Sequence, residues 1–307
     1  MCISKIHFNH LTMSISNITT AQLRILVAIV DETSFSAAAA RIGMTQSGAS
    51  QAIRVLETAL GAKLLERGRG GVVPTEIGRT VLQDARDAVL AIERMQQRCA
   101  AASGLQIGNL RIGSVASAAA RILPQVLAQF RRHYPGVQLT MLEGTDQEVL
   151  QWVETGIVDI GLTSETSSEI DSRVIAEDDF LLLVNRDHAL SKRRRVKLAE
   201  IADESFLMSG SGCEPAIRQL FASNGAAPRV TLTIRDTATL VEMVLQGVGV
   251  TLMPELSIPK DERRLSRISI EPRSRRRLLA IMRSGTLPPP VAEKFVQLLS
   301  GRMRARR

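Results

Sequence analysis

Residues 34–71 constrain this chain most, because they place two helical patterns, two glycine stops and a basic glycine-rich turn in close succession. Ser34 is a typical helix N-cap before an alanine-rich segment, and Gly43 stands where that helix would end. Thr45 then caps a further segment that runs to Gly61. Apolar side chains also recur at helical spacing just upstream. The pattern predicts three short helices with a tight turn between the second and the third.

The third predicted helix has two chemically different faces when its residues are spaced at about 100°. Ala49, Ile53 and Leu56 share one face and would close a small core. The opposite face carries polar side chains of the types that hydrogen-bond base edges and phosphates. An ordinary solvated face is the alternative, but glutamine and serine in place of glutamate and lysine weigh against it. The predicted DNA contacts of this helix are Thr45, Gln46, Ser47, Ser50, Gln51 and Arg54.

A small hairpin with a basic tip is predicted after this helix. Two short β-prone pieces flank the turn Arg67-Gly68-Arg69-Gly70-Gly71. Arg67 and Arg69 suit the phosphate backbone or a narrow minor groove. Helices and hairpin together predict a winged helix-turn-helix DNA-binding domain over residues 18–75.

Residues 23–78 resemble the N-terminal domain of the LysR-type transcriptional regulators. The family pattern reads here as Ser34-Phe35, Ala38-Ala39, Thr45-Gln46, Ser50, Ile53, Leu56-Glu57, Leu60-Gly61, Leu64-Leu65, Arg67 and Thr75-Glu76-Ile77-Gly78. By this resemblance Gln46, Ser47, Ser50 and Gln51 contact DNA. Gly48, Gln51 and Ala52 differ from the residues common in the family, which bears on base preference and not on binding.

A long helix is predicted from Glu76 to about Ala102, within a linker region of residues 76–103. Apolar side chains follow at alternating steps of four and three, which is typical of a helix pair. They are Ile77, Val81, Ala85, Ala88, Ile92, Met95 and Cys99. Packing on its own domain is the alternative to a dimer seam. The resemblance favours the seam, since family members dimerise through this helix and generally form dimers of dimers.

Residues 108–300 alternate apolar strands with amphipathic helices, which predicts an α/β domain with a parallel sheet and two lobes. One helix is expected from Ala118 to His133 and one strand from Phe180 to Asn185. Further along, the arginine-rich runs at 192–195, 273–277 and 302–307 are expected to be solvated loops and tail, with non-specific DNA contact as the alternative.

Ligands in such folds bind at the carboxyl ends of strands, where helix N-termini offer free N–H groups. Four strand–helix junctions here are small and hydroxylated, which suits a small anion or a polar ligand, although N-caps and turns explain any single junction equally well. The candidate effector-binding residues are Ser114, Ala116, Ser117, Thr145, Ser209, Ser211, Cys213, Asp236 and Thr237.

The C-terminal part also resembles the effector-binding half of the LysR-type regulators, which is similar to periplasmic binding proteins. The residues that carry the resemblance include Leu123-Pro124, Tyr134-Pro135, Asp159-Ile160-Gly161 and Gly247-Val248-Gly249. The resemblance implies that a small-molecule effector binds in the cleft between two lobes.

Composition narrows the classes of function. A net charge of +8 favours an anionic partner, nucleic acid first and a membrane surface second. No run approaches the ~20 apolar residues of a membrane helix, so no membrane partner is expected. The cysteines Cys2, Cys99 and Cys213 give neither a disulfide framework nor metal-ligand spacing. We therefore expect a cytoplasmic protein without a metal or other cofactor.

The sequence predicts a regulator that binds a double-stranded DNA operator, responds to a small molecule, and contacts RNA polymerase if it activates. A redox-responsive regulator is one alternative, because Cys213 begins a predicted helix whose dipole lowers thiol pKa. Peroxide-sensing relatives carry a reactive cysteine in this region but pair it with a second one, and none follows Cys213 here. An α/β enzyme is disfavoured, since the histidines are scattered and no nucleophile elbow or metal cluster appears. A purely architectural DNA binder is also disfavoured, because such a protein would need no pocket-like junctions.

Overall fold

The computed structural model describes residues 18–68, 70–102, 107–285 and 288–304, so the predictions for Arg69 and for Cys2 lie outside the described residues. The chain forms two compact units, divided between Gln96 and Gln97. No helix in the described part is both long and apolar enough to cross a membrane.

The first unit begins with three helices and a hairpin, as predicted. These elements are α1 (Thr20–Glu32), α2 (Phe35–Ile42), α3 (Gln46–Leu60), β1 (Leu65–Gly68) and β2 (Gly71–Pro74). Each helix begins at a side chain that accepts a backbone N–H: Thr19, Ser34 and Thr45. Gly43 and Gly61 end α2 and α3 in the left-handed conformation that glycine tolerates best. Local sequence signals therefore determine where the helices begin and end.

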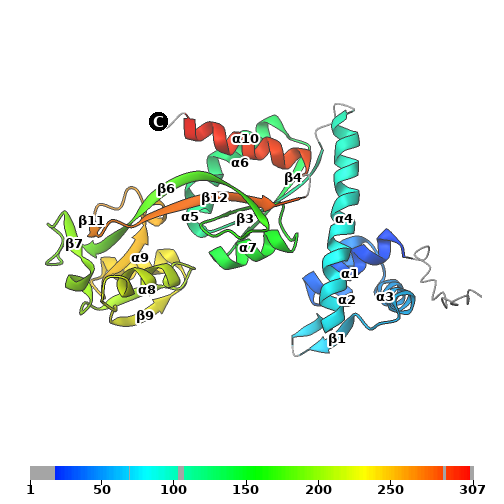
Figure 1. Cartoon of the computed structure of the whole chain (residues 1–307), viewed down its shortest axis with the longest axis horizontal. Helices are drawn as coiled ribbons and strands as arrows, with labels where there is room; N and C mark the ends of the chain where they lie inside the picture. Colours follow the sequence, from blue (N-terminus) through cyan, green and yellow to red (C-terminus); the bar gives the residue numbers. More distant parts are fainter. Residues whose placement is uncertain (1–17, 69, 103–106, 286–287, 305–307) are drawn as a thin grey trace, which may run out of the picture. The chain divides into compact units, whose positions relative to one another are not determined.

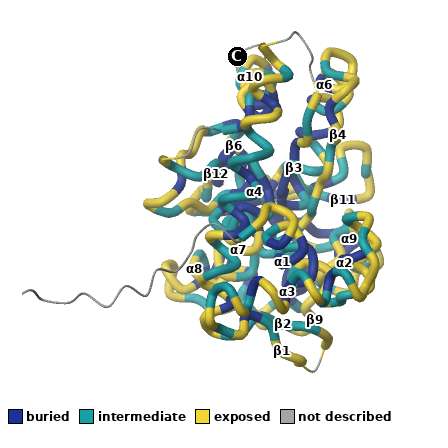
Figure 2. The backbone as a smooth tube through the Cα atoms, turned by 90° about the vertical axis from the view of Figure 1, so that its right-hand side faces the viewer, coloured by how far each residue is buried: buried dark blue, intermediate teal, exposed yellow. Residues whose placement is uncertain are grey.

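Alanines let the three helices pack closely. Ala38 and Ala39 of α2 and Ala49 of α3 are buried against Ile25 and Ile29 of α1. The hairpin has exposed and half-buried residues but no buried ones among those described (Figure 2). Leu65 and Val72 pack against the edge of this core, and the hairpin forms the wing. The long helix α4 (Glu76–Ala102) follows the wing directly (Figure 1).

The second unit is a two-lobed α/β structure. Its helices are α5 (Ala116–Arg121), α6 (Leu123–His133), α7 (Asp146–Glu154), α8 (Glu214–Ala222), α9 (Thr237–Leu245) and α10 (Pro290–Arg304), with 3₁₀ turns η2 (Leu198–Ile201) and η3 (Glu255–Ser257). Its strands are β3 (Gly108–Ser114), β4 (Val137–Glu143), β5 (Ile160–Thr163), β6 (Ile170–Asn185), β7 (Arg195–Lys197), β8 (Phe206–Ser209), β9 (Val230–Ile234), β10 (Thr251–Pro254), β11 (Leu265–Glu271) and β12 (Arg275–Arg283).

The sheet is mixed, which corrects the prediction of a parallel sheet. An eight-stranded sheet has the order β4-β3-β5-β12-β6-β11-β7, with β10 also paired to β6, and β8 pairs β9 separately. The pairs β3–β4 and β3–β5 are parallel, whereas β12 runs antiparallel to both β5 and β6. The long ribbon of β6 and β12 therefore crosses from one lobe to the other (Figure 1).

Two further local predictions are corrected. The helix expected from Ala118 to His133 is two helices that meet at Ile122, with Pro124 in the first turn of α6, where its missing N–H costs nothing. The arginines at 275–277 lie in β12 and not in a solvated loop, and Arg276 is buried. Lys192 to Arg194 are exposed before β7, as expected.

Each lobe has its own hydrophobic core. The first contains Ile112, Phe130 and Phe295, among others, and brings α10 against β3 and α6. The second contains Phe206 and Phe221, whose rings meet edge to face, together with residues of β6, β10 and β11. Two separately packed lobes joined by a ribbon leave a cleft that can hold a ligand.

Candidate functional site

The outer face of α3 presents polar side chains free of the protein core. Gln46, Ser47, Gln51 and Arg54 are exposed and Ser50 is half-buried, while Ala49, Ile53 and Leu56 on the opposite face are buried. The predicted separation of faces is therefore confirmed. The hydroxyl of Thr45 is used within the protein, because it accepts the Gly48 N–H at 3.1 Å.

Two arginines near this face have no described acidic partner. Arg54 on α3 and Arg67 on β1 are exposed and form no ion pair with any residue that the structure describes. An exposed, uncompensated guanidinium is the group that phosphate oxygens attract best.

The end of α3 is attached to the wing and to the start of α4. Glu57 Oε1 accepts the Leu64 N–H at 2.8 Å and the Leu65 N–H at 3.3 Å. The Thr75 hydroxyl donates to Lys63 O at 2.8 Å and accepts the Gly78 N–H at 3.0 Å. These contacts give physical reasons for the Leu-Glu and Thr-x-x-Gly parts of the sequence pattern.

Gly78 is required by a close approach of two backbones. A Cβ atom on Gly78 would lie 2.0 Å from the Leu64 carbonyl oxygen, a distance that no side chain can tolerate. The first turn of α4 is thus held directly against the chain that leads into the wing.

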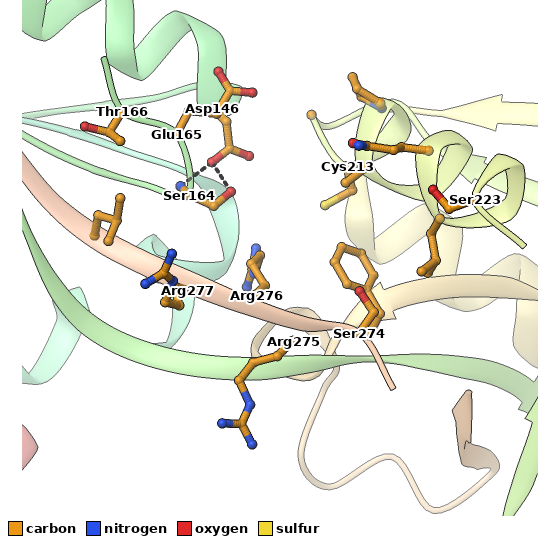
Figure 3. Close-up of a pocket in the computed structure, with 17 residues that line it drawn as sticks. Asp146, Ser164, Glu165, Thr166, Cys213, Ser223, Ser274, Arg275, Arg276 and Arg277 are labelled. Atoms are coloured by element: carbon orange, nitrogen blue, oxygen red, sulfur yellow. Dashed lines mark hydrogen bonds between the residues drawn. The ribbon is translucent and has the colours of Figure 1, made fainter. Parts of the chain in front are cut away.

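The second unit contains a cavity of about 480 Å³ between elements of both lobes. In Figure 3, Asp146 and Ser164 lie on one wall, Cys213 lies across from them, and Arg276 and Arg277 project from β12. An adjoining recess of about 10 Å³ has room for about one water molecule. Asp146, Cys213 and Arg276 line both spaces, so the cavity and the recess are neighbours.

The recess brings together most of the predicted effector residues. Those that line it are Ala116, Ser117, Ser209, Ser211, Cys213 and Thr237. Ser117 is 4% exposed, and its hydroxyl has no hydrogen-bond partner among the described atoms. The hydroxyls of Ser209 and Ser211 lie 2.8 Å apart. Separate sequence segments thus converge on a small polar pocket.

Three other predicted residues do not line either space, and their side chains have local roles. Ser114 is fully buried and donates to Val115 O at 3.0 Å. Thr145 caps α7 and exchanges hydrogen bonds with Glu148, and Asp236 caps α9 through the Thr239 N–H at 2.7 Å. Thr145 and Asp236 are therefore helix caps, and the Ser114 hydroxyl bonds to the neighbouring backbone.

The lobes meet beside the recess. A Cβ atom on Gly212, after β8, would lie 3.2 Å from Thr145 Cβ and 3.4 Å from the Asp146 nitrogen at the start of α7. Gly212 has a φ of +106°, which favours glycine. A larger residue at this point would hold the lobes apart.

Sequence reasoning missed two acidic residues and one arginine at this site. Asp146 is buried, and its Oδ1 accepts the hydroxyls of Thr163 and Ser164, each at 2.7 Å. Arg276 donates twice to Asp178, each bond 2.9 Å long, and both side chains are buried. The sequence of β12, three arginines followed by five apolar residues, gives no local sign that Arg276 is buried.

The electrostatics of the cavity correct the expectation for Cys213. Burial raises the pKa of its thiol to about 11, despite the nearby Arg276 guanidinium. The helix N-terminus at α8 therefore does not produce a thiolate here. Burial, and then the negative charge of Asp146, also raise the pKa of Glu165 above its ordinary value.

Each of the two units matches a known family model. The family model of the bacterial regulatory helix-turn-helix protein, lysR family, matches residues 20–79, and that of the LysR substrate binding domain matches residues 103–304. The chain belongs to the LysR family of transcriptional regulators. It is a DNA-binding transcriptional regulator with an effector-binding domain, and not an enzyme.

Individual relatives of this LysR-type regulator cover most of its length. The probable HTH-type transcriptional regulator LrrA of Synechococcus elongatus is 38% identical over 244 residues, 78% of this chain and 82% of that protein. A probable hydrogen peroxide-inducible genes activator of Mycobacterium avium is 31% identical over 278 residues, 87% of this chain and 89% of that protein.

Solved structures share the fold. A full-length OxyR variant from Pseudomonas aeruginosa has a TM-score of 0.72 at 21% identity, covering 93% of this chain and 94% of that one. Full-length CbnR in complex with its target DNA has a TM-score of 0.62 at 23% identity, covering 92% and 98%. The predicted winged helix-turn-helix with a two-lobed α/β domain is thereby confirmed.

Proposed function

We propose that this LysR-type regulator switches its operator contacts when a small polar molecule binds between the lobes of its second unit. The observation that carries the proposal is the buried hydroxyl of Ser117, which faces the recess without a described partner. A buried polar group that lacks a hydrogen bond costs free energy, and a ligand that accepts this hydrogen bond would recover it.

The proposed DNA contacts are the free face of α3 and the wing. Gln46, Ser47, Ser50 and Gln51 would read base edges, while Arg54 and Arg67 would neutralise phosphates. Arg69, outside the described residues, is proposed as a further phosphate contact. One such face is small, so selection of a site would require two or four copies of the chain.

We propose residues 18–75 as the DNA-binding domain, 76–103 as the pairing helix and 108–300 as the effector domain. Ile77 and Met95 on α4 are 49% and 60% exposed, and two copies of this helix would cover them. A dimer of such dimers is the proposed assembly. Its place of action is where the genome lies, the cytoplasm, with RNA polymerase as a partner if it activates.

The proposed effector carries an acceptor group for Ser117 and donors for the opposite wall. A small carboxylate would satisfy the serine hydroxyls at one end. Asp146 has one oxygen without a described hydrogen bond, and it accepts only. Hydroxylated or amino-substituted organic acids therefore suit this cavity better than purely apolar ones.

The DNA contacts can be tested with the double variant Gln46→Ala, Ser50→Ala. It should lose at least about tenfold in affinity for an operator selected from random DNA while keeping its affinity for unrelated duplexes, because each base contact is worth about 1–3 kcal/mol. Thr58→Ala, on the same helix, serves as the matched control. An unchanged operator affinity in the double variant would show that Gln46 and Ser50 of α3 do not recognise the operator sequence.

The effector site can be tested with Ser117→Ala, which removes the buried hydroxyl without overpacking the recess. A panel of small carboxylates, with and without hydroxyl or amino groups, is screened by thermal shift against the natural protein. Compounds that raise its melting temperature should have no effect on the variant, whereas DNA binding without effector stays intact. A retained response in Ser117→Ala would place the effector elsewhere.

A redox switch at Cys213 is a second candidate, and the names of the mycobacterial relatives favour it. The buried, protonated thiol argues against it, because the thiolate is the form that peroxide attacks. We therefore propose effector binding, and not cysteine oxidation, as the switch.

A further inference from the structure

The last two residues of α1 and its C-cap, Asp31–Thr33, are contacted by three other parts of the first unit. Arg41 of α2 reaches the Asp31 carboxylate at 3.5 Å and the Glu32 carboxylate at 3.1 Å. Arg86 of α4 donates to the other oxygen of Asp31. We call this segment the Asp31 turn.

The wing is attached to the same turn. The Thr33 carbonyl accepts the Val72 N–H at 2.9 Å, and a Cβ on Gly71 would lie 2.4 Å from that carbonyl oxygen. Thr33 itself adopts φ +52°, an uncommon value for a threonine. The Asp31 turn therefore holds the second helix, the wing and the long helix in one place.

Arg86 and Arg41 contact the same carboxylate but differ in burial. The Arg86 side chain is 8% exposed, whereas that of Arg41 is 52% exposed. An exposed ion pair contributes little, while removal of one partner from a buried pair leaves a charge without compensation. The contact between the long helix and the Asp31 turn is thus the stronger of the two.

The long helix contacts the rest of its unit over its first three turns, where Ala85 is buried in the core of this unit and Val81 and Leu82 pack against it. Two polar contacts bracket this apolar stretch. Gly78 packs on the Leu64 carbonyl at the first turn of α4, and Arg86 holds Asp31 about 12 Å further along, at ~1.5 Å per residue. One point of contact allows a rod to pivot, whereas two points define its direction. Arg86 therefore acts with the apolar contacts of Val81, Leu82 and Ala85 to fix the angle between α4 and the helix α3, and it is the charged contact that holds α4 to the Asp31 turn.

We propose that Arg86 is a positioning residue for operator recognition, because it sets the spacing between the α3 helices of two paired chains. This inference rests on the proposed pairing through α4. With the paired α4 helices as the fixed frame, a pivot near Gly78 would turn α3 through the same angle in each chain, so the two α3 helices would change both their spacing and their relative orientation on the operator.

The experiment compares Arg86→Ala with Arg41→Ala, which removes the other arginine on Asp31 without touching the long helix. Operators selected with the natural protein are rebuilt with one or two base pairs added or removed between the half-sites. The natural protein and Arg41→Ala should lose at least about tenfold in affinity for a two-base-pair change. Arg86→Ala should bind the original operator more weakly and lose less than about threefold on changing the spacer, and Arg86→Lys should restore most of the discrimination.

A loss of folding is distinguished from a loss of positioning by a second measurement. In a background of Cys2→Ser, Cys99→Ser and Cys213→Ser, a spin label at Val55→Cys on the exposed side of α3 reports the distance between paired chains. The distance distribution should broaden with Arg86→Ala and stay narrow with Arg41→Ala. Equal widths, or spacing discrimination retained in Arg86→Ala, would overturn the proposal.

The basis of the inference is tested separately by the mass of the natural protein in solution. A mass of a single chain, with no dependence on half-site spacing, would contradict the pairing through α4 and the inference with it. A dimer or tetramer whose spacing preference ignores Arg86 would contradict the positioning role alone.

Discussion

The DNA-binding unit and the effector unit build their functional surfaces from contacts of very different range. In the first unit, Ser34 and Thr45 cap helices through N–H groups three residues away. In the second, the cavity depends on Arg276 meeting Asp178, a partner 98 residues distant in the chain. A reading surface can thus be specified locally, whereas a cleft between lobes requires the whole topology.

The two surfaces also differ in how they treat charge. Arg54 and Arg67 in the first unit are exposed without a described acidic partner, so their guanidinium groups can bind DNA phosphates. Around the cleft, Arg276 is neutralised by Asp178, and Asp178 also accepts the Leu256 N–H at 2.9 Å. Arg54 and Arg67 are thus available for an external partner, whereas Arg276 is used to join two strands beside the cavity.

The strongest test of this comparison is Arg276→Met. It leaves Asp178 buried without its cation, so the free energy of unfolding of the second unit should fall by about 3–5 kcal/mol. Urea denaturation, followed by the fluorescence of Trp152 in α7, measures this loss. Arg273→Ala is the matched control, because Arg273 is 67% exposed in its pair with Asp179, and its removal should lower the free energy of unfolding much less. Equal losses in the two variants would mean that burial of the pair is unimportant.

The next largest effect concerns the cysteine in the cleft. With its pKa raised to about 11, the Cys213 thiol stays protonated at neutral pH, and deprotonation begins only well above the pH at which an ordinary thiol ionises. In a Cys2→Ser, Cys99→Ser variant at about pH 7.5, where an ordinary thiol is already partly ionised, alkylation of Cys213 should be at least about a hundredfold slower in native protein than in urea, as followed by mass spectrometry. Rapid modification of Cys213, or DNA binding that changes with micromolar peroxide, would instead support a redox switch at Cys213.

The structure of the first unit could be predicted largely from the sequence. The three short helices, their caps and the two glycine stops were identified to within a residue, because each signal acts on neighbouring residues. The separation of polar and apolar faces on α3 was predicted for the same reason. The contacts of Glu57 and Gly78 to the wing were implied only as a family pattern, without their physical cause.

The second unit was predictable in class but less so in detail. Its small, hydroxylated junctions were found, and several do line the recess, but Thr145 and Asp236 cap helices instead. Strand β12 was mistaken for a basic loop because its arginines face acidic residues of β6, which are about a hundred positions away. No local signal reports such a partner, so the antiparallel ribbon and the buried Arg276 could not be derived.

A smaller effect is expected from the local contact at the start of the reading helix. Thr45→Ala removes the cap from α3 and should lower the stability of the first unit by about 1 kcal/mol, within the range of about 0.5–2 kcal/mol for lost caps. Thr45→Ser retains the hydroxyl and should behave as the natural protein. Thermal unfolding followed by circular dichroism provides the measurement. A loss as large as that of Arg276→Met would contradict the distinction between local and long-range contacts.

The smallest effect belongs to a single exposed arginine on the wing. Arg67→Ala should weaken binding to all duplexes alike, since a phosphate contact carries no sequence information. The slope of log affinity against log salt should become shallower by about 0.9, the value for one phosphate contact, and affinity at moderate salt should change only severalfold. Anisotropy titrations over a range of salt concentrations, on the operator and on an unrelated duplex, give both slopes. A loss confined to the operator would instead assign Arg67 to base reading in the groove, and the free charge of the first unit would then serve specificity as well as attraction.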